Sequence, residues 1–408
     1  MQRPNMTVSQ SKILVLYTGG TIGCLNTERG LTVQPGFLSD WLRSQSAFND
    51  PNAGTVASHA HSQAVYNAWL GSEQLPNPGK GDEEQSVLTG FETPDEKTLI
   101  TPVFRFGGEM KKIRYTIREV NDPLVGSSSI DPAAWMRIAN DIRNSAGHFD
   151  GFVVLHGTDT MAYTASALAF LLADLPKPVV LTGAQIPLCE YSSDATNNFR
   201  GALLSAGMKD LPEVCIFFNR KLMRGCRTRK VSSFEVDAFD SPLMKPLLIA
   251  DVEHSYQRPD APSDSKSVLM NAVAAMSSQV IILHIWPGMT TRQLKLMLSD
   301  PETKGVVMYT YGAGNFPIVQ EMLDVLKEAI KQGLIVVNVS QCARGKVLPL
   351  YITGVVLNEI GVVAGNDMTP ECAFVKLSYL LAQDHLSLEA KKRWLGMSMV
   401  GEMAAVAT

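Results

Sequence analysis

The sequence predicts an α/β protein of two domains, each with a mainly parallel sheet, joined by a linker. Short apolar runs alternate with segments of helical periodicity, which is typical of parallel strands connected by helices. The length of 408 residues exceeds that of one ordinary domain. A polar, proline-containing stretch at 251–266 interrupts the alternation, as a linker would. We therefore expect an N-terminal domain over 1–250, a linker over 251–278 and a C-terminal domain over 279–408.

The first predicted strand leads into the segment around which the N-terminal domain is organised. Residues 13–16 are a continuous apolar run, typical of a strand buried on both faces of a sheet. The run ends at Thr18-Gly19-Gly20-Thr21, where glycines allow a sharp turn close to a ligand. Because ligands bind at the carboxyl ends of strands in such sheets, Thr21 is a candidate reactive residue. The glycine spacing matches no nucleotide-binding motif.

The next part of the chain has few apolar residues. Residues 24–36 are rich in polar and turn residues, and we expect a mobile loop that acts as a lid over Thr21. A short helix is expected at 37–43. Residues 44–110 are mostly polar and are expected to be a surface insertion without a catalytic role. His59 and His61 lie in it without further Cys or His nearby, so we expect no zinc site.

A second apolar strand ends in a polar turn. Residues 152–155 lead into His156-Gly157-Thr158-Asp159-Thr160, and a helical pattern follows at once. A glycine, a hydroxyl, an acid and a helix N-terminus suit an anion or an oxyanion. Upstream, the loop Gly126-Ser127-Ser128-Ser129 precedes Asp131-Pro132, which predict an N-cap and a first helical residue.

The remaining elements continue the alternation of strand and helix. Further strands are predicted at 113–120, 178–181, 214–218, 279–285, 306–309 and 334–339, and further helices at 194–206, 290–298, 318–332, 369–383 and 387–396.

Composition excludes several classes of function. The net charge is -4 without any basic tract, so neither nucleic acid nor an anionic membrane is an expected partner. No apolar run is long enough to span a membrane, and the N-terminus has no secretory signal. The six cysteines are scattered without a CxxC pair, which is typical of reduced, mostly buried thiols in a cytoplasmic protein.

The two strand ends and a basic loop together suggest nucleophilic catalysis. A threonine nucleophile needs a proton acceptor, and the loop RGCRTRK at 224–230 ends in Lys230, which would serve as one.

At this point the sequence resembles the bacterial-type asparaginases, most closely the cytoplasmic type I enzymes. The resemblance covers nearly the whole chain except 44–110. The matching stretches are YTGGTIG at 17–23, LHGTDTMAYTASAL at 155–168, LTGAQIPL at 181–188, FFNRKLMRG at 217–225, YGAGNFP at 311–317, GLIVVNVSQC at 333–342 and AGNDMTPECAFVKLSYLL at 364–381. The first two motifs in this order are highly specific for the family.

The resemblance implies hydrolysis of L-asparagine to L-aspartate and ammonia, with no cofactor and no metal. Thr21 matches the threonine that attacks the side-chain amide. Thr158, Asp159 and Lys230 match the second catalytic group, in which Asp159 also receives the substrate's α-ammonium. Backbone N–H groups near Thr158 would stabilise the oxyanion.

Further substrate contacts follow from the same resemblance. Gly126, Ser127 and Ser128 match the loop that holds the α-carboxylate. L-Glutamine is expected at most as a weak substrate, because one methylene is worth only about 1–3 kcal/mol of discrimination.

One position departs from the family pattern. Many relatives carry a tyrosine about ten residues after the nucleophile, and this chain has Leu31 there. Members without that tyrosine have one in the C-terminal domain that reaches the site from a neighbouring protomer, and Tyr351 matches it. Asn315 matches another residue that crosses the subunit boundary. The resemblance therefore implies a homodimer or a dimer of dimers.

Two other interpretations remain open. The asparaginase-like subunit of a tRNA-dependent amidotransferase shares the motifs but adds an N-terminal barrel, for which a first strand at Lys12 leaves no room. A catalytically silent member used for binding is the other alternative. The joint presence of Thr21, Thr158, Asp159 and Lys230 argues against it.

Overall fold

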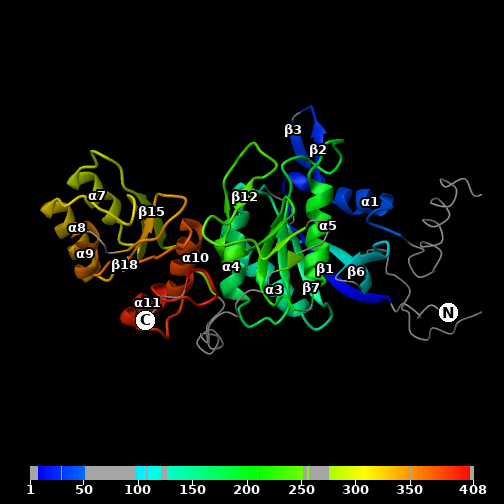
Figure 1. Cartoon of the computed structure of the whole chain (residues 1–408). Helices are drawn as coiled ribbons and strands as arrows, with labels where there is room; N and C mark the ends of the chain where they lie inside the picture. Colours follow the sequence, from blue (N-terminus) through cyan, green and yellow to red (C-terminus); the bar gives the residue numbers. More distant parts are fainter. Residues whose placement is uncertain are drawn as a thin grey trace, which may run out of the picture.

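The computed structural model describes residues 8–28, 30–50, 98–106, 109–120, 126–208, 210–250, 255–256, 275–348 and 352–404. His59, His61, Tyr351 and most of the predicted linker lie outside these residues. Two domains lie side by side, the N-terminal one from blue to green and the C-terminal one from yellow to red (Figure 1). This arrangement agrees with the two α/β domains that the sequence predicts.

The N-terminal domain is built on one large sheet. Within the described residues it has 10 strands in the order β14-β13-β10-β9-β8-β7-β1-β6-β4, with β5 paired to β6. Its strands are β1 (Ser9–Tyr17), β4 (Thr98–Ile100), β5 (Phe104–Phe106), β6 (Glu109–Glu119), β7 (Gly151–Leu155), β8 (Val179–Thr182), β9 (Val214–Phe218), β10 (Lys221–Arg224), β13 (Leu248–Ile249) and β14 (Ser255–Tyr256). The central strands β6, β1, β7, β8 and β9 are parallel, and antiparallel strands flank them.

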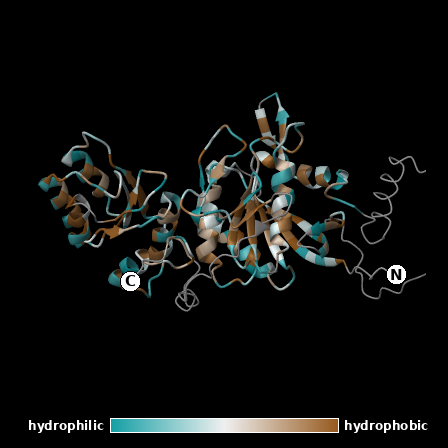
Figure 2. Cartoon of the chain, in the orientation of Figure 1, coloured by the Kyte–Doolittle hydropathy of each residue, from teal (hydrophilic) through white to brown (hydrophobic). Residues whose placement is uncertain are grey.

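Helices cover both faces of this sheet. One face packs against α3 (Pro132–Ser145) and α4 (Met161–Leu171), and the other against α1 (Phe37–Ser44) and α5 (Ala195–Ala206). The central strand β7 is buried along its whole length, as its apolar run predicts, and Figure 2 shows apolar residues concentrated in the sheet between the helices. The predicted cap of α3 is confirmed, because Asp131 Oδ1 accepts a hydrogen bond from Ala134 N at 2.7 Å.

The C-terminal domain has a smaller, fully parallel sheet. Its order is β15-β16-β17-β18. The strands are β15 (Val280–His284), β16 (Gly305–Thr310), β17 (Ile335–Ser340) and β18 (Val363–Ala364). The helices are α7 (Thr291–Leu298), α8 (Gln320–Lys331), α9 (Ile352–Glu359), α10 (Pro370–Leu381) and α11 (Leu388–Leu395). Residues of α7, α8 and α9 share one apolar cluster with the sheet, and residues of α10 and α11 share the cluster that faces the N-terminal domain.

Three expectations were wrong in detail. The predicted loop 24–36 contains an antiparallel hairpin, β2 (Cys24–Thr27) with β3 (Gly30–Val33). Part of the predicted insertion 44–110 belongs to the fold, because β4, β5 and the start of β6 lie in the main sheet and Phe48 is 2% exposed. Within the predicted linker, Ser255–Tyr256 forms the edge strand β14.

The two domains share an apolar boundary crossed by polar contacts. The ring of Phe170 in α4 stacks on Tyr379 in α10, with centroids 5.4 Å apart. Arg227, in the 3-10 helix η3 (Gly225–Arg227), donates hydrogen bonds to Asp367 Oδ2 at 2.7 Å and to the carbonyl oxygen of Glu402 at 2.9 Å. Ala404 N in turn donates to Asp367 Oδ1 at 2.8 Å, so the segment 399–404 lies along the boundary.

Candidate active site

Four neighbouring strands of the main sheet bring the predicted site residues together. The strands lie in the order β6, β1, β7, β8 and are all parallel, so their carboxyl ends share one edge. Ser127 follows β6, Thr21 follows β1, Thr158 and Asp159 follow β7, and Gln185 follows β8. The edge therefore carries three hydroxyls, a carboxylate and an amide from loops far apart in sequence.

Glycines allow these loops to touch at the backbone. A Cβ atom on Gly20, whose φ is +91°, would lie 2.4 Å from the Cα atom of Gly157. A Cβ atom on Gly157 would lie 2.6 Å from Ser127 Oγ. Any side chain at either glycine would force the segments apart. The next residues along the two segments are Thr21 and Thr158, so glycine brings the two candidate catalytic hydroxyls onto adjacent turns.

Lys230 joins the cluster by hydrogen bonds to both members of the second predicted catalytic group. Its Nζ atom lies 2.8 Å from Thr158 Oγ1 and 2.8 Å from Asp159 Oδ1. The Lys230 side chain is 18% exposed and the Asp159 side chain 68% exposed. The carboxylate therefore remains open to a ligand, whereas the ammonium is largely enclosed.

Short local elements hold Lys230 in place. It ends β11 (Arg229–Lys230), which pairs antiparallel with β12 (Phe239–Asp240), and Lys230 is opposite the buried Phe239. The segment before β11 is the 3-10 helix η3, whose Cys226 and Arg227 are buried. A buried support on each side of β11 explains how a long, flexible side chain holds one position.

Gln185 is a site residue that the sequence analysis missed. Its Oε1 atom accepts from Thr158 Oγ1 at 3.1 Å, and its Nε2 donates to the carbonyl oxygen of Glu235 at 3.2 Å. Asp194 accepts from the backbone N–H groups of Gln185 and Ile186 and so fixes the turn. The motif LTGAQIPL contains Gln185, and its position directly after a parallel strand was the signal that could have identified it.

Thr21 begins the 3-10 helix η1 (Thr21–Gly23) and is partly exposed. None of the described residues forms a hydrogen bond with its hydroxyl. Leu31, at the position of the family tyrosine, lies in β3, is 52% exposed and has no polar side-chain atom. The described part of one chain thus leaves the Thr21 hydroxyl without a proton acceptor.

The remaining predicted substrate-binding residues lie in different domains. Ser127 is buried in the 3-10 helix η2 (Ser127–Ser129), with Gly126 and Ser128 exposed beside it, and its carbonyl oxygen accepts from Thr160 Oγ1 at 2.7 Å. Asn315 lies in the turn after β16 in the C-terminal domain and is not part of the Thr158–Lys230 network. In one chain, Asn315 therefore stays outside the cluster.

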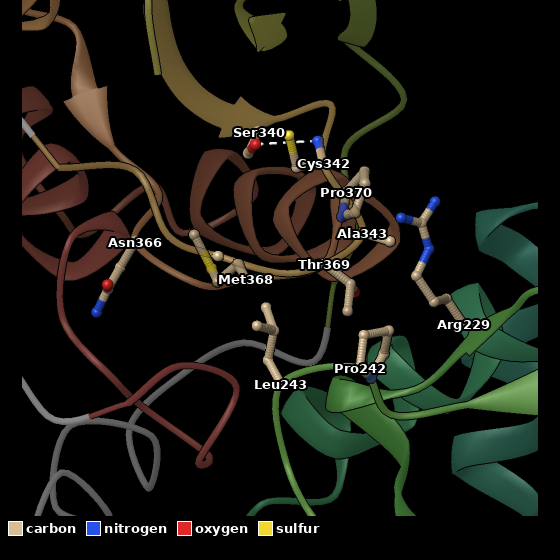
Figure 3. Close-up of a pocket in the computed structure, with 11 residues that line it drawn as sticks. Arg229, Pro242, Leu243, Ser340, Cys342, Ala343, Asn366, Met368, Thr369 and Pro370 are labelled. Carbon is tan, nitrogen blue, oxygen red and sulfur yellow. Dashed lines mark hydrogen bonds between the residues drawn. The ribbon is translucent and has the colours of Figure 1, made fainter. Parts of the chain in front are cut away.

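A small pocket lies between the two domains beside β11. Figure 3 shows Arg229, Pro242 and Leu243 of the N-terminal domain facing Cys342, Thr369 and Pro370 of the C-terminal domain. The space open to the centre of a water molecule is about 10 Å³, which suits roughly one water. Arg229 Nη2 contacts Glu371 Oε1 at 3.3 Å and the Tyr309 hydroxyl at 3.4 Å, so it joins the two domains here.

Further candidate groups were considered within the described residues. No cluster of three or more His, Cys, Asp or Glu side chains there is arranged to hold a metal ion. No helix among them has the length and apolar character needed to cross a membrane. The six cysteines are free thiols, buried except for Cys189 and Cys342.

Comparison with known proteins identifies a family over most of the chain. The family described as "Asparaginase, N-terminal" matches residues 12–261, and "Glutaminase/Asparaginase C-terminal domain" matches residues 279–395. An L-asparaginase of Dirofilaria immitis is 36% identical over 402 residues, which are 98% of this chain and 61% of that protein. A 60 kDa lysophospholipase of Mus musculus is 37% identical over 399 residues, which are 98% of this chain and 64% of that protein. The chain thus spans somewhat less than two thirds of the length of these relatives.

A solved structure matches over its whole length. The crystal structure of L-asparaginase I from Vibrio cholerae has a TM-score of 0.73 and 33% sequence identity, covering 97% of this chain and 100% of that chain. The two-domain fold with mainly parallel sheets is therefore the fold of that enzyme.

Proposed function

The chain belongs to the asparaginase family, and we propose that it hydrolyses L-asparagine to L-aspartate and ammonia through a β-aspartyl ester on Thr21. The observation that carries the proposal is the hydrogen-bonded Lys230–Thr158 pair on the turn that touches Gly20, next to Thr21. This arrangement supplies a nucleophile and a proton-transfer pair on adjacent strand ends.

Substrate binding uses charged and polar groups at the carboxyl edge of the main sheet. The carboxylate of Asp159 accepts a charge-assisted hydrogen bond from the α-ammonium group of asparagine. The exposure of the Asp159 side chain supports this contact, because a substrate can reach it. The polar segment Gly126-Ser127-Ser128 holds the α-carboxylate with N–H and hydroxyl donors. These two contacts fix the side-chain amide of the substrate between Thr21 and Thr158.

Acylation replaces the C–N bond of the substrate amide by a C–O bond to Thr21 and moves one proton. Thr21 Oγ1 attacks the side-chain carbonyl carbon of asparagine, its proton passes to the departing nitrogen, and the C–N bond breaks to release ammonia. Backbone N–H groups near Thr158 stabilise the oxyanion between these events.

Deacylation then uses water as the nucleophile. Water attacks the ester carbonyl while its proton is relayed through the Thr158–Lys230 pair to the departing Thr21 oxygen, and the ester C–O bond breaks to release L-aspartate. No cofactor takes part in either half of the reaction.

A neighbouring protomer completes the site in this proposal. The Thr21 hydroxyl has no proton acceptor among the described residues, and Tyr351 and Asn315 are assigned to it from a partner's C-terminal domain. The loop after Lys230 itself carries exposed apolar side chains, with Phe234 93% and Val231 52% exposed, which supports an interface there. We propose a homodimer or a dimer of dimers, with its reduced thiols suited to the cytoplasm.

Ammonia release from purified protein tests the proposal. The protein is expected to release ammonia from L-asparagine, only weakly from L-glutamine, and not from asparagine after Thr21→Ala substitution. Because one relative is a lysophospholipase, lysophosphatidylcholine is the comparison substrate. Release of fatty acid from it, without ammonia from asparagine, would refute the proposed function.

A further inference from the structure

His156 is a fully buried titratable residue to which the proposed mechanism gives no role. It follows β7 directly, is 0% exposed, and precedes Gly157 and the candidate catalytic Thr158. Its backbone N–H donates to the carbonyl oxygen of Thr182 at 2.9 Å, which continues the β7–β8 pairing. The side chain therefore lies beneath the turn that carries the site.

The polar atoms of the His156 ring have partners on both sides. Nδ1 lies 2.7 Å from the carbonyl oxygen of Gly157, and Nε2 lies 2.9 Å from Thr164 Oγ1. Thr164 Oγ1 in turn accepts a hydrogen bond from the indole Nε1 of Trp135 at 3.1 Å. All of these side chains are buried, so each hydrogen bond is shielded from water.

The partners determine which nitrogen carries the proton. Burial lowers the pKa of His156 to about 4, against a smaller rise from the hydrogen bond to Gly157, so the ring is neutral at pH 7. A neutral imidazole has one donor and one acceptor, and a carbonyl oxygen can only accept. Nδ1 therefore carries the proton and donates to Gly157, whereas Nε2 accepts from the Thr164 hydroxyl.

The Gly157 carbonyl belongs to the same peptide unit as the Thr158 N–H. In a planar trans peptide, the C=O and N–H bonds point in opposite directions. With the carbonyl directed at the His156 ring in the core, the Thr158 N–H is directed away from the core. None of the described residues offers a backbone acceptor to this N–H.

Close contacts restrict the backbone on the N-terminal side of this peptide as well. A Cβ atom on Gly183 would lie 2.3 Å from the carbonyl oxygen of His156, and Gly157 itself abuts Ser127 and Gly20. The segment can move little, and the hydrogen bond from His156 Nδ1 selects its orientation.

We propose that His156 is a positioning residue that, through the Gly157 carbonyl, aims the Thr158 N–H at the substrate's carbonyl oxygen. This inference rests on the proposed asparagine hydrolysis and adds a buried residue to it. The competing interpretation is a core histidine that fills space and satisfies its own polar atoms.

Two substitutions separate these interpretations. In His156→Asn the amide nitrogen replaces Nδ1, since both atoms are bonded to Cγ, and the bond to Gly157 survives. In His156→Gln the longer amide reaches the position of Nε2, and the bond to Thr164 survives while the one to Gly157 is lost. Asparagine is the smaller residue and leaves the larger void, so His156→Asn is expected to be the less stable variant.

The expected order of activity is opposite to the order of stability. His156→Gln should lose about 10- to 100-fold in kcat with KM changed less than about threefold, because an oxyanion donor is misaligned. His156→Asn should stay within about threefold of the unsubstituted protein in kcat, measured by ammonia release at a temperature where both variants are folded. If His156→Gln is as active as His156→Asn or more active, His156 only fills space and the proposal is wrong.

A measurement on the unsubstituted protein covers the case in which a variant does not fold. Nitrogen NMR of ¹⁵N-histidine-labelled protein is expected to show one neutral ring with the proton on Nδ1, unchanged between pH 5 and 8. A ring protonated on Nε2, or a ring that titrates in this range, would overturn the assignment. Absence of ammonia release by the unsubstituted protein would instead refute the proposed function, while the NMR result still decides whether His156 holds Gly157.

Discussion

Arg229 and Lys230 are consecutive residues of β11 that contact different domains. Lys230 Nζ donates to Thr158 in the N-terminal domain, whereas Arg229 Nη2 contacts Glu371 at the start of α10 in the C-terminal domain. The position of the candidate catalytic lysine is therefore coupled through one peptide bond to the domain boundary.

The Arg229–Glu371 pair is expected to stabilise the contact between the two domains. The two side chains are 23% and 13% exposed, so removing one leaves the other charge partly buried and unpaired. Arg229→Met and Glu371→Gln should each lower the free energy of unfolding by about 1–3 kcal/mol, with the double variant losing less than the sum. Urea unfolding of the four proteins measures the coupling.

An ion pair on the surface provides the control for this double-mutant comparison. Glu389→Gln removes the partner of Lys392 at a site where Glu389 is 81% exposed, and should leave the unfolding midpoint unchanged. Additive effects of Arg229→Met and Glu371→Gln would mean that the two residues do not interact in solution.

Thr21→Ala is expected to lower the rate of ammonia release by at least about 10³-fold, because the hydroxyl that forms the ester is missing. Thr21→Ser keeps the hydroxyl and should retain measurable turnover. Thr21 is partly exposed, so both variants should unfold at the urea concentration of the unsubstituted protein. Turnover by Thr21→Ala near that of the unsubstituted protein would show that another residue is the nucleophile.

Lys230→Met should reduce kcat by about 10²–10⁴-fold, the range of general acid–base effects, with a smaller change in KM. The matched control is Lys221→Met, which removes a nearby lysine paired with Asp237 at 2.8 Å but not connected to Thr158. That control should leave kcat almost unchanged. A large rise in KM with kcat preserved in Lys230→Met would assign Lys230 to substrate binding alone.

Asp367 predicts a pH-dependent part of the stability. Burial raises the pKa of Asp367, but hydrogen bonds from Arg227 and from the backbone outweigh it, so the folded pKa lies below that of an ordinary aspartate. A lowered pKa stabilises the fold above the unfolded value, and this contribution is lost as the pH falls through the folded value. Asp367→Asn should therefore lower the free energy of unfolding at pH 7 by about 1–3 kcal/mol, with the difference shrinking below pH 4.

Urea unfolding at several pH values measures this effect. Asp174→Asn is the comparison, because the pair of Asp174 with Arg143 is more exposed, at 43% for the Asp174 side chain, and should matter less. A stability difference for Asp367→Asn that stays constant from pH 7 to pH 3 would contradict the assignment to the ionised carboxylate.

Tyr351 stays a prediction, and subunit exchange tests it. If a partner's Tyr351 serves Thr21, Thr21→Ala and Tyr351→Phe damage different halves of a shared site. Mixed and allowed to exchange subunits, two inactive variants should recover up to about a quarter of full activity, since some sites then contain both residues. The control is each variant exchanged with itself.

Two results would speak against a shared site. If Tyr351→Phe is severely impaired and exchange restores nothing, the tyrosine acts within its own chain. Full activity of Tyr351→Phe alone would remove it from catalysis.

The sequence predicted the parts of the fold that local pattern controls. The buried run before Thr21 and the Asp131-Pro132 cap became β1 and the start of α3, because burial on both faces and capping leave clear signals. The hairpin β2–β3 was missed because most of its residues are exposed and polar, so no apolar alternation marks it. Likewise, the ring of Phe48 packs against a partner far along the chain, Phe199, with centroids 5.4 Å apart, which no local pattern predicts.

The same distinction applies to the candidate site. Thr21 and Thr158 could be predicted because each follows an apolar strand directly, and parallel strands place their carboxyl ends together. Gln185 follows a strand as well, but an amide has no reactivity that suggests a role. Its bonds to Thr158 and to the Glu235 carbonyl depend on a fold that brings three segments together, which no local pattern encodes.

The segment 399–404 gives the molecule an order of assembly during synthesis. A chain emerging from the ribosome can complete its main sheet once Tyr256 has left the exit tunnel, because domains fold as units from the N-terminus. Glu402 and Ala404, which bond to Arg227 and Asp367, emerge only after every other described element. Until Tyr379 of α10 has emerged and stacked on it, Phe170 of α4 stays accessible to other nascent chains, so this interval exposes the chain to aggregation.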